Sequence, residues 1–117
     1  MLFVNYPKCT TCKKAKKWLE EQGADFEDRN IKENNPGTDE IRLWHKASGL
    51  PLKKLFNTSG QLYRSMGLKD KLDKMSDEEK YELLASDGML VKRPILVAED
   101  AVLFGFKESE WEKALNK

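Results

Sequence analysis

The sequence predicts an α/β protein with a four-stranded mixed sheet and a helical insertion between the two halves of that sheet. A short apolar stretch at 2–6, followed by an amphipathic helical pattern, predicts the first half. Two apolar stretches at 95–98 and 101–104 predict a β-hairpin that forms the second half, and the residues between the halves are helical in pattern. The 117 residues have the usual size of one domain, so we expect a single domain over 1–117 with its insertion at about 38–90.

The first half begins with a strand at 2–6 that ends at Pro7. Helical spacing then relates Cys12, Ala15, Trp18, Leu19 and Gln22, of which the first four are apolar, lysines fill the other faces, and Gly23 ends the helix. The segment 25–31 alternates only loosely, but a strand is the usual continuation after such a strand and helix. We therefore expect it to pair in parallel with the first strand.

The middle of the chain is predicted to be helical. A turn at 34–37 and Thr38 as an N-cap predict a helix that ends near 49–51. The block from 52 to 88 stays helical in short pieces, with a capping box at 76–79.

After this block, a tight turn at 99–100 joins the two hairpin strands, and a final helix is expected at 108–115. The predicted order is strand, helix, strand, helices, strand, strand, helix. With a parallel pair at the front and an antiparallel hairpin at the back, this is the thioredoxin-like arrangement, expanded by helices between its halves.

The composition argues against several classes of partner and location. The 21 basic and 20 acidic side chains nearly cancel, so we expect no general affinity for nucleic acid or for a membrane surface. No apolar run approaches the roughly 20 residues of a membrane-spanning helix, and the first residues lack the basic start of a signal peptide. Two cysteines are too few for a disulfide-stabilised secreted scaffold, so we expect a cytoplasmic protein.

The segment Cys9-Thr10-Thr11-Cys12 lies where the first strand gives way to the first helix. Unsatisfied N–H groups and the positive end of the helix dipole favour an anion there, so the pKa of Cys9 is expected to fall from about 8.5 to between roughly 3.5 and 7.5. Lys8 and Lys13 add positive charge. Cys12, one turn further on, is placed to attack a mixed disulfide at Cys9, so the pair is predicted to close and open reversibly.

Two other interpretations of the cysteines stay open. They could be half of a zinc site, although four-coordinate zinc needs about two further ligands and the chain has one histidine and no other cysteine. They could also be inert core residues, since free cysteines are commonly buried. The strand, the proline and the basic helix around the pair favour redox chemistry. We interpret the remaining candidates as His45 at the surface or a boundary, 13–17 as a solvated lysine face, and Trp18, Trp44 and Trp111 as core.

Arg93 and Pro94 directly precede the predicted strand at 95–98. A proline that begins a strand opposite the cysteines is a candidate for a cis peptide bond, and an ordinary trans proline is the alternative. A guanidinium beside Cys9 would stabilise its thiolate or bind an oxyanion with two parallel hydrogen bonds.

Two motifs in the chain resemble those of the arsenate reductase (ArsC)/Spx family. The first covers 6–15, 18–19 and 29–31, and the second covers 92–97 and 105–106, so the resemblance spans essentially the whole chain. It implies a thioredoxin-like fold with a helical insertion, a nucleophilic first cysteine, and an active-site arginine before a cis-proline. The candidate catalytic residues are then Cys9, Cys12 and Arg93, and the candidate substrate-binding residues are Lys8, Thr10, Thr11 and Pro94.

The chain departs from the arsenate reductases of this family at two positions. Those enzymes hold the oxyanion with two further arginines, whose positions fall near Asn57 and at Gly105 here. Arsenate would therefore lose charge-assisted hydrogen bonds worth roughly 1.5–3 kcal/mol each. We do not expect efficient arsenate reduction.

The predicted function is thiol–disulfide oxidoreduction, arsenate-reductase-like or glutaredoxin-like in its chemistry, with Cys9 as nucleophile and Cys12 as resolving thiol. We expect a thiol, disulfide or oxyanion substrate, glutathione or thioredoxin as reductant, and no bound cofactor or metal. The resemblance to Spx implies an alternative, a redox-sensing transcriptional regulator that binds RNA polymerase and uses the disulfide as an oxidation switch. A third interpretation is an interaction protein that makes no redox use of its cysteines.

Overall fold

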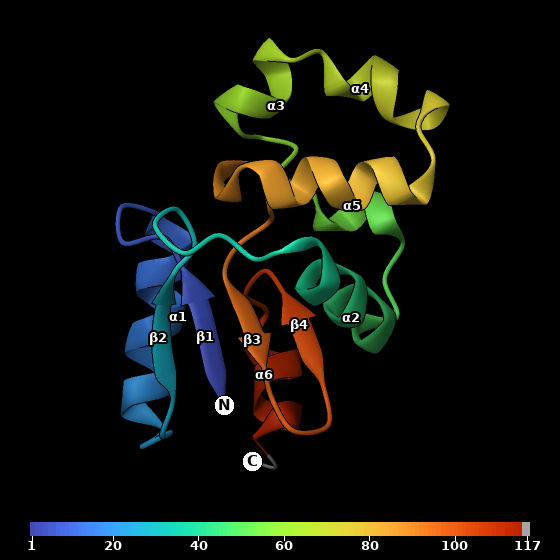
Figure 1. Cartoon of the computed structure of the whole chain (residues 1–117). Helices are drawn as coiled ribbons and strands as arrows, with labels where there is room; N and C mark the ends of the chain where they lie inside the picture. Colours follow the sequence, from blue (N-terminus) through green and yellow to red (C-terminus); the bar gives the residue numbers. More distant parts are fainter. Residues whose placement is uncertain (116–117) are drawn as a thin grey trace.

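The computed structural model describes residues 1–115, and its four strands form one mixed sheet with helices on both faces (Figure 1). The strand order is β2-β1-β3-β4. β1 pairs in parallel with β2 and antiparallel with β3, and β3 pairs antiparallel with β4. This topology confirms the predicted fold class. The strands are β1 (Leu2–Asn5), β2 (Glu27–Asn30), β3 (Ile95–Val97) and β4 (Val102–Phe104).

The helices follow the order that the sequence predicts, with one helix between β1 and β2, a helical block before β3, and one helix after β4. The α-helices are α1 (Thr10–Glu21), α2 (Thr38–Ser48), α3 (Gln61–Ser65), α4 (Leu68–Lys71), α5 (Asp77–Ser86) and α6 (Glu108–Ala114). Short 3-10 helices are η1 (Leu52–Leu55), η2 (Leu72–Lys74) and η3 (Gly88–Leu90).

Each face of the sheet has its own hydrophobic core, because neighbouring residues of a strand point to opposite faces. On one face, Phe3 and Leu96 pack with Trp18 of α1 and Trp111 of α6. On the other face, a larger core joins the sheet to α2 and to the insertion. The sheet residues of this second core are Val4, Ile95 and Val102. Trp44 of α2 also lies in it, so all three tryptophans are buried, as predicted.

The start of α2 differs by one residue from the sequence prediction. Thr38 is the first residue of the helix and not its N-cap, because Gly37 occupies the N-cap position and donates its N–H to the Glu40 carboxylate (3.1 Å). The same carboxylate accepts two hydrogen bonds from the Arg29 guanidinium in β2 (2.8 and 2.9 Å). These contacts tie the start of α2 to β2.

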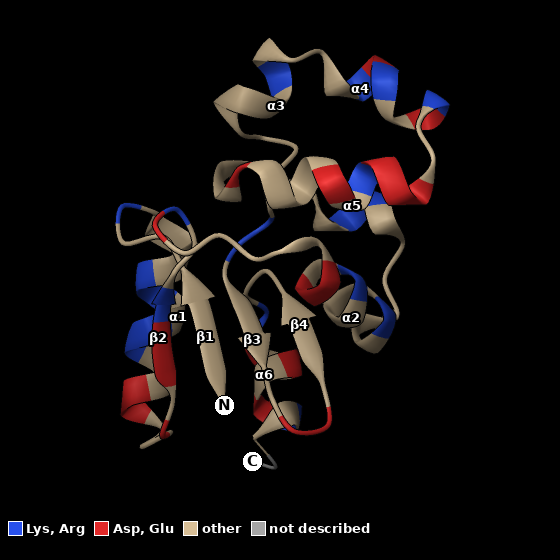
Figure 2. Cartoon of the chain, viewed as in Figure 1, with Lys and Arg blue, Asp and Glu red and all other residues tan. Residues whose placement is uncertain are grey.

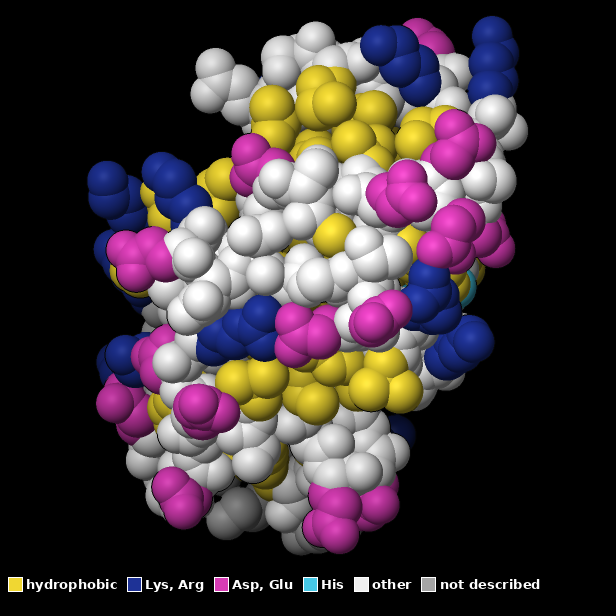
Figure 3. All heavy atoms as spheres, in the orientation of Figure 1, with side chains coloured by type: hydrophobic (Ala, Val, Ile, Leu, Met, Phe, Trp, Pro, Cys, Tyr) yellow, Lys and Arg dark blue, Asp and Glu magenta, His cyan; other side chains and the backbone are white. Residues whose placement is uncertain are grey.

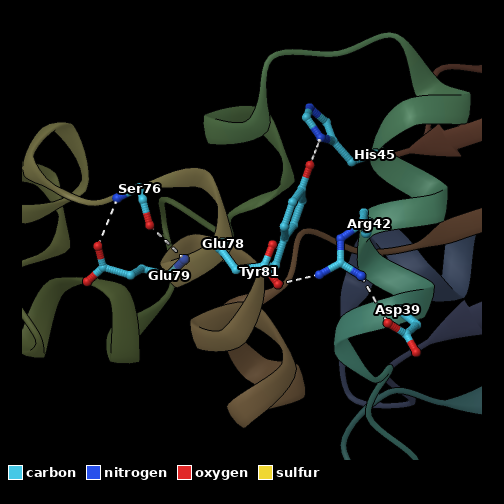
Figure 4. Close-up of polar contacts among 7 residues, drawn as sticks. All are labelled: Asp39, Arg42, His45, Ser76, Glu78, Glu79 and Tyr81. Atoms are coloured by element: carbon cyan, nitrogen blue, oxygen red, sulfur yellow. Dashed lines mark hydrogen bonds and ion pairs between the residues drawn. The ribbon is translucent and has the colours of Figure 1, made fainter.

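The predicted capping box at the start of α5 is confirmed. The Ser76 hydroxyl accepts a hydrogen bond from the Glu79 N–H (3.2 Å), and the Glu79 carboxylate accepts one from the Ser76 N–H (3.1 Å) (Figure 4). Two N–H groups that a free helix end would leave unpaired are therefore satisfied.

Polar side chains join α5 to α2 (Figure 4). The Tyr81 hydroxyl lies 2.6 Å from Nδ1 of the half-buried His45, which is the boundary position expected for this histidine. One turn away, the Arg42 guanidinium donates hydrogen bonds to Glu78 and to Asp39 and lies over the Tyr81 ring. The insertion is thereby anchored on the helix that covers one face of the sheet.

The insertion returns to the sheet through a short β-bridge between Phe56 and Val91. The N–H of the next residue, Lys92, donates to the Leu55 carbonyl (2.8 Å). This pairing fixes the segment 92–94 at the beginning of β3.

Charged side chains cover much of the surface, and in α1 the lysines of 13–17 precede Glu20 and Glu21 at the end of the helix (Figure 2). Hydrophobic side chains reach the surface over the insertion, where the partly buried Leu62 and Met66 pack against the core (Figure 3). None of the helices within residues 1–115 has the length and apolar character needed to cross a lipid bilayer.

Candidate active site

Cys9 is the N-cap residue of α1. A tight turn after β1 brings it there, and the Cys9 N–H donates to the Tyr6 carbonyl (3.0 Å). Its own carbonyl accepts the first hydrogen bond of the helix, from the Lys13 N–H (3.0 Å). The sulfur therefore lies beside the unpaired N–H groups at the positive end of the helix dipole, as the sequence predicts.

The pKa of Cys9 lies below its ordinary value, although the largest single influence, partial burial, opposes ionisation. The influences that favour ionisation together outweigh this effect of burial. The backbone N–H groups of Cys12 and Thr11 and the Cys12 thiol donate hydrogen bonds to the sulfur, and the positive charge of Arg93 attracts the thiolate. Cys9 is thus the more acidic sulfur of the pair.

Cys12 has the opposite electrostatic environment. It is buried, and this burial, together with the neighbouring Cys9 thiolate, raises its pKa to about 12. Its sulfur accepts a weak hydrogen bond from the Tyr6 N–H (3.5 Å). Both cysteines are free in this structure, and the pKa of Cys9 is lowered whereas that of Cys12 is raised.

Arg93 lines the same cavity as Cys9 and lowers the pKa of its thiol, and the peptide bond between Arg93 and Pro94 is cis. Its guanidinium lies 5.3 Å from the centre of the Tyr6 ring. Two of its nitrogens, Nε and Nη1, are buried and have no hydrogen-bond partner among the residues that the structure describes. Buried donors normally have partners, so these two nitrogens have unused capacity to donate hydrogen bonds.

A cavity of about 650 Å³ opens beside these groups. Cys9, Thr11 and Arg93 line it, together with residues from the segment before α3 and from β4 and the segment that follows. The charged residues that line it are Lys54, Lys92, Arg93 and Lys107, with Glu110 as the one carboxylate among the lining residues described. The charged residues that line the cavity beside the Cys9 sulfur are therefore mostly cationic.

The family model of the ArsC family matches residues 4–114 of this sequence. The chain belongs to the ArsC family. The protein YusI of Bacillus subtilis, named as uncharacterized, is 51% identical over 113 residues, which are 97% of this chain and 96% of YusI. A crystal structure of an ArsC-family-related protein from Bacteroides fragilis is 51% identical with a TM-score of 0.94, and the match covers 97% of this chain and 95% of that one. The regulator Spx 2 of Bacillus cereus is 29% identical over 107 residues, 92% of this chain and 80% of its own length.

Two positions of the cavity wall can be compared with the arsenate reductases of this family. Asn57 and Gly105, where the resemblance places the two further arginines of arsenate reductases, both line the cavity with Cys9 and Arg93. In this ArsC-family protein neither position provides a guanidinium, so the oxyanion-binding set is incomplete there.

The candidate substrate-binding residues differ in their position. Thr11 lines the cavity, and Pro94 is buried at the cis peptide bond. Lys8 and Thr10 are exposed and are not among the residues that line the cavity. All four roles remain predictions.

Sequence reasoning assigned no role to three cavity lysines, at positions 54, 92 and 107. Nothing in the sequence distinguishes them from the other basic residues, of which the chain has 21. The one available signal is that Lys92 directly precedes Arg93. Within residues 1–115, no three His, Cys, Asp or Glu side chains come together as a group able to hold a metal ion.

Proposed function

We propose that this ArsC-family protein is a thiol–disulfide oxidoreductase in which Cys9 is the nucleophile and Cys12 the resolving thiol. The observation that supports this most strongly is the opposite direction of two pKa shifts, lowered at Cys9 and raised to about 12 at Cys12. Exchange requires one thiolate that attacks and one thiol that waits until a mixed disulfide has formed.

In the first step the Cys9 thiolate attacks one sulfur of a disulfide substrate, and the S–S bond of the substrate breaks to release a thiolate. The mixed disulfide no longer has a negative charge at Cys9. Two of the causes that raise the pKa of Cys12, its hydrogen bond to Cys9 and the repulsion by the Cys9 charge, then disappear. Cys12 becomes more acidic when its thiolate is needed.

In the second step Cys12 gives its proton to the released thiolate and attacks the Cys9 sulfur. The second half of the substrate leaves as a thiolate and takes a proton from solvent, so the substrate has gained two electrons and the protein holds a Cys9–Cys12 disulfide. Two glutathione thiols, or one dithiol of the thioredoxin type, return the pair to the dithiol and are themselves oxidised to a disulfide. Arg93 stabilises the Cys9 thiolate in the reduced state and, through its two unpaired nitrogens, holds an acceptor atom of the substrate.

The experiment that tests this proposal is turnover of hydroxyethyl disulfide in a system coupled to glutathione and glutathione reductase. Cys9→Ser should abolish turnover, and Cys12→Ser should accumulate a mixed disulfide on Cys9 that mass spectrometry detects. Far-UV circular dichroism of both variants should match the parent. Unchanged turnover in Cys9→Ser would refute the proposal, and arsenate should be a poor substrate throughout.

The similarity to Spx 2 over 92% of the chain supports a second candidate, a regulator whose disulfide controls binding to RNA polymerase. The same protein, reduced or oxidised, can be passed over immobilised bacterial RNA polymerase. Redox-dependent retention without disulfide turnover would favour the regulator over the enzyme. Equal behaviour of parent, Cys9→Ser and Cys12→Ser in both assays would favour an interaction protein without redox chemistry.

A further inference from the structure

The side chain of Lys92 lies across Gly105 in the cavity wall. A Cβ atom on residue 105 would be 2.8 Å from Cε of Lys92 and 3.8 Å from its Nζ. Gly105 also has a φ of 81°, a left-handed conformation that residues with a Cβ rarely adopt. The glycine therefore leaves open the space through which the lysine side chain passes.

The backbone holds both residues in this relation. Lys92 is fixed by its N–H bond to the Leu55 carbonyl (2.8 Å). Gly105 is fixed by donating its N–H to the Pro94 carbonyl (2.8 Å) and by accepting a hydrogen bond from the Trp111 indole (3.1 Å). The backbone of Lys92, one residue before Arg93, is therefore fixed in position.

No carboxylate within residues 1–115 forms an ion pair with either of these two cations, although the charge of Arg93 also acts on the Cys9 thiolate. Within residues 1–115, the Lys92 ammonium forms no ion pair, and Nε and Nη1 of Arg93 have no hydrogen-bond partner. The carboxylate that lines the cavity, Glu110, lies 3.9 Å from another lysine, Lys107. Uncompensated positive charge beside a cavity favours an anionic ligand.

We propose that Lys92 is a specificity-determining residue beside Arg93, and that its ammonium group makes the site prefer substrates with a carboxylate close to the atom that reacts with the Cys9 sulfur. This inference rests on the proposed nucleophilic role of Cys9 and adds the class of substrate. Arg93 acts on both the thiolate and the ligand, whereas Lys92 acts on the ligand alone, because it is not among the groups that shift the pKa of Cys9.

The test compares two alkylating reagents that differ in charge, iodoacetate and iodoacetamide. With either reagent the Cys9 thiolate forms an S–C bond, the C–I bond breaks and iodide leaves. The ratio of the two rate constants at Cys9, measured by mass spectrometry, reports the preference for a carboxylate. In Lys92→Gln this ratio should fall about threefold to fivefold, the size expected for one solvent-accessible charge pair.

Three comparisons make this test specific. The rate with iodoacetamide should be unchanged in Lys92→Gln, and Lys92→Arg should retain the parent ratio. Lys17→Gln, which removes an exposed charge from α1 outside the cavity, should also retain it. Added salt should lower the ratio in the parent more steeply than in Lys92→Gln, where Arg93 still attracts the carboxylate.

An unchanged ratio in a folded Lys92→Gln protein would overturn the inference, and so would an equal fall in Lys17→Gln. Failure of the proposed function gives a different result, namely a Cys9 that reacts with iodoacetamide no faster than a cysteine in an unfolded peptide. Inorganic phosphate at constant ionic strength provides a second arm. If phosphate slows the iodoacetate reaction, tetrahedral oxyanions share the site, and if it does not, the site is specific for carboxylates.

Discussion

The pKa values of two thiols that are three residues apart are shifted in opposite directions by their local environment. Cys9 is half-buried at the helix N-terminus with N–H donors and Arg93 around it, whereas Cys12 is buried within the first turn. Each thiol also affects the other, because the Cys12 thiol stabilises the Cys9 thiolate and that thiolate opposes a second charge at Cys12. The two titrations are therefore coupled.

This coupling predicts the effect of removing one sulfur. In Cys9→Ser the negative charge beside Cys12 is absent, so the pKa of Cys12 should fall from about 12 but stay above that of a free cysteine, because its burial remains. Titration of thiolate absorbance in the ultraviolet measures this. A Cys12 that titrates as in the parent would show that the coupling is absent.

At the residue scale the sequence predicted the position of Cys9 better than the positions of the residues around it. Cys9 could be placed because a strand, a proline and a helix pattern follow one another directly in the chain, and such local geometry determines the position of an N-cap. Lys54, Lys92 and Lys107 could not be placed, since their approach to Cys9 depends on how the insertion and β4 return to the sheet.

At the scale of elements, the insertion is held to the rest of the fold by a few identifiable contacts. The Tyr81 hydroxyl of α5 pairs with His45 of α2 (2.6 Å). In Tyr81→Phe the half-buried histidine loses this partner, so the free energy of unfolding should fall by about 1 kcal/mol. Urea denaturation measures the loss. Tyr63→Phe is the matched control, because Tyr63 is equally buried and no protein group within residues 1–115 pairs with its hydroxyl, and its stability should be unchanged.

The insertion also approaches the rest of the fold closely at Gly88, near its end. A Cβ at this position would collide with the backbone carbonyl of Ile31, just after β2, which cannot move as a side chain can. Gly88→Ala should therefore lower the free energy of unfolding by about 1–3 kcal/mol. Gly37→Ser, at a glycine with open space around it and at an N-cap position that serine favours, should not. Equal stability of the two variants would contradict the contact.

The elements that the sequence predicted well are those specified by local signals. The capping box of α5 is an example, because Ser76 and Glu79 satisfy each other's backbone N–H groups without help from elsewhere. The predicted N-cap of α2 was wrong by one residue. The Glu40 carboxylate accepts a hydrogen bond from the Gly37 N–H, and Arg29 of β2 holds that carboxylate in place, which the local sequence does not reveal. The predicted strand at 25–31 shortens to Glu27–Asn30, the residues that find partners in β1.

At the scale of the whole molecule, both cores depend on the same strands. Phe3 and Val4 are neighbours in β1 but belong to different cores, and Ile95 and Leu96 divide in the same way in β3. This sharing could be predicted in outline from the order of strands and helices. The helices that close the larger core could not, because the short helices of the insertion have no pattern that specifies their packing.

Because the strands are shared, loss of either core removes strand residues that the other needs, and we expect both cores to unfold in one transition. The tryptophans allow a test, since Trp44 lies in the larger core and Trp18 and Trp111 in the smaller. Trp44→Phe reports the smaller core by fluorescence, and the double variant Trp18→Phe/Trp111→Phe reports the larger. In each variant the urea midpoint from fluorescence should coincide with that from far-UV circular dichroism. A fluorescence midpoint displaced from the dichroism midpoint in either variant would mean that the insertion, or the layer of α1 and α6, unfolds independently of the sheet.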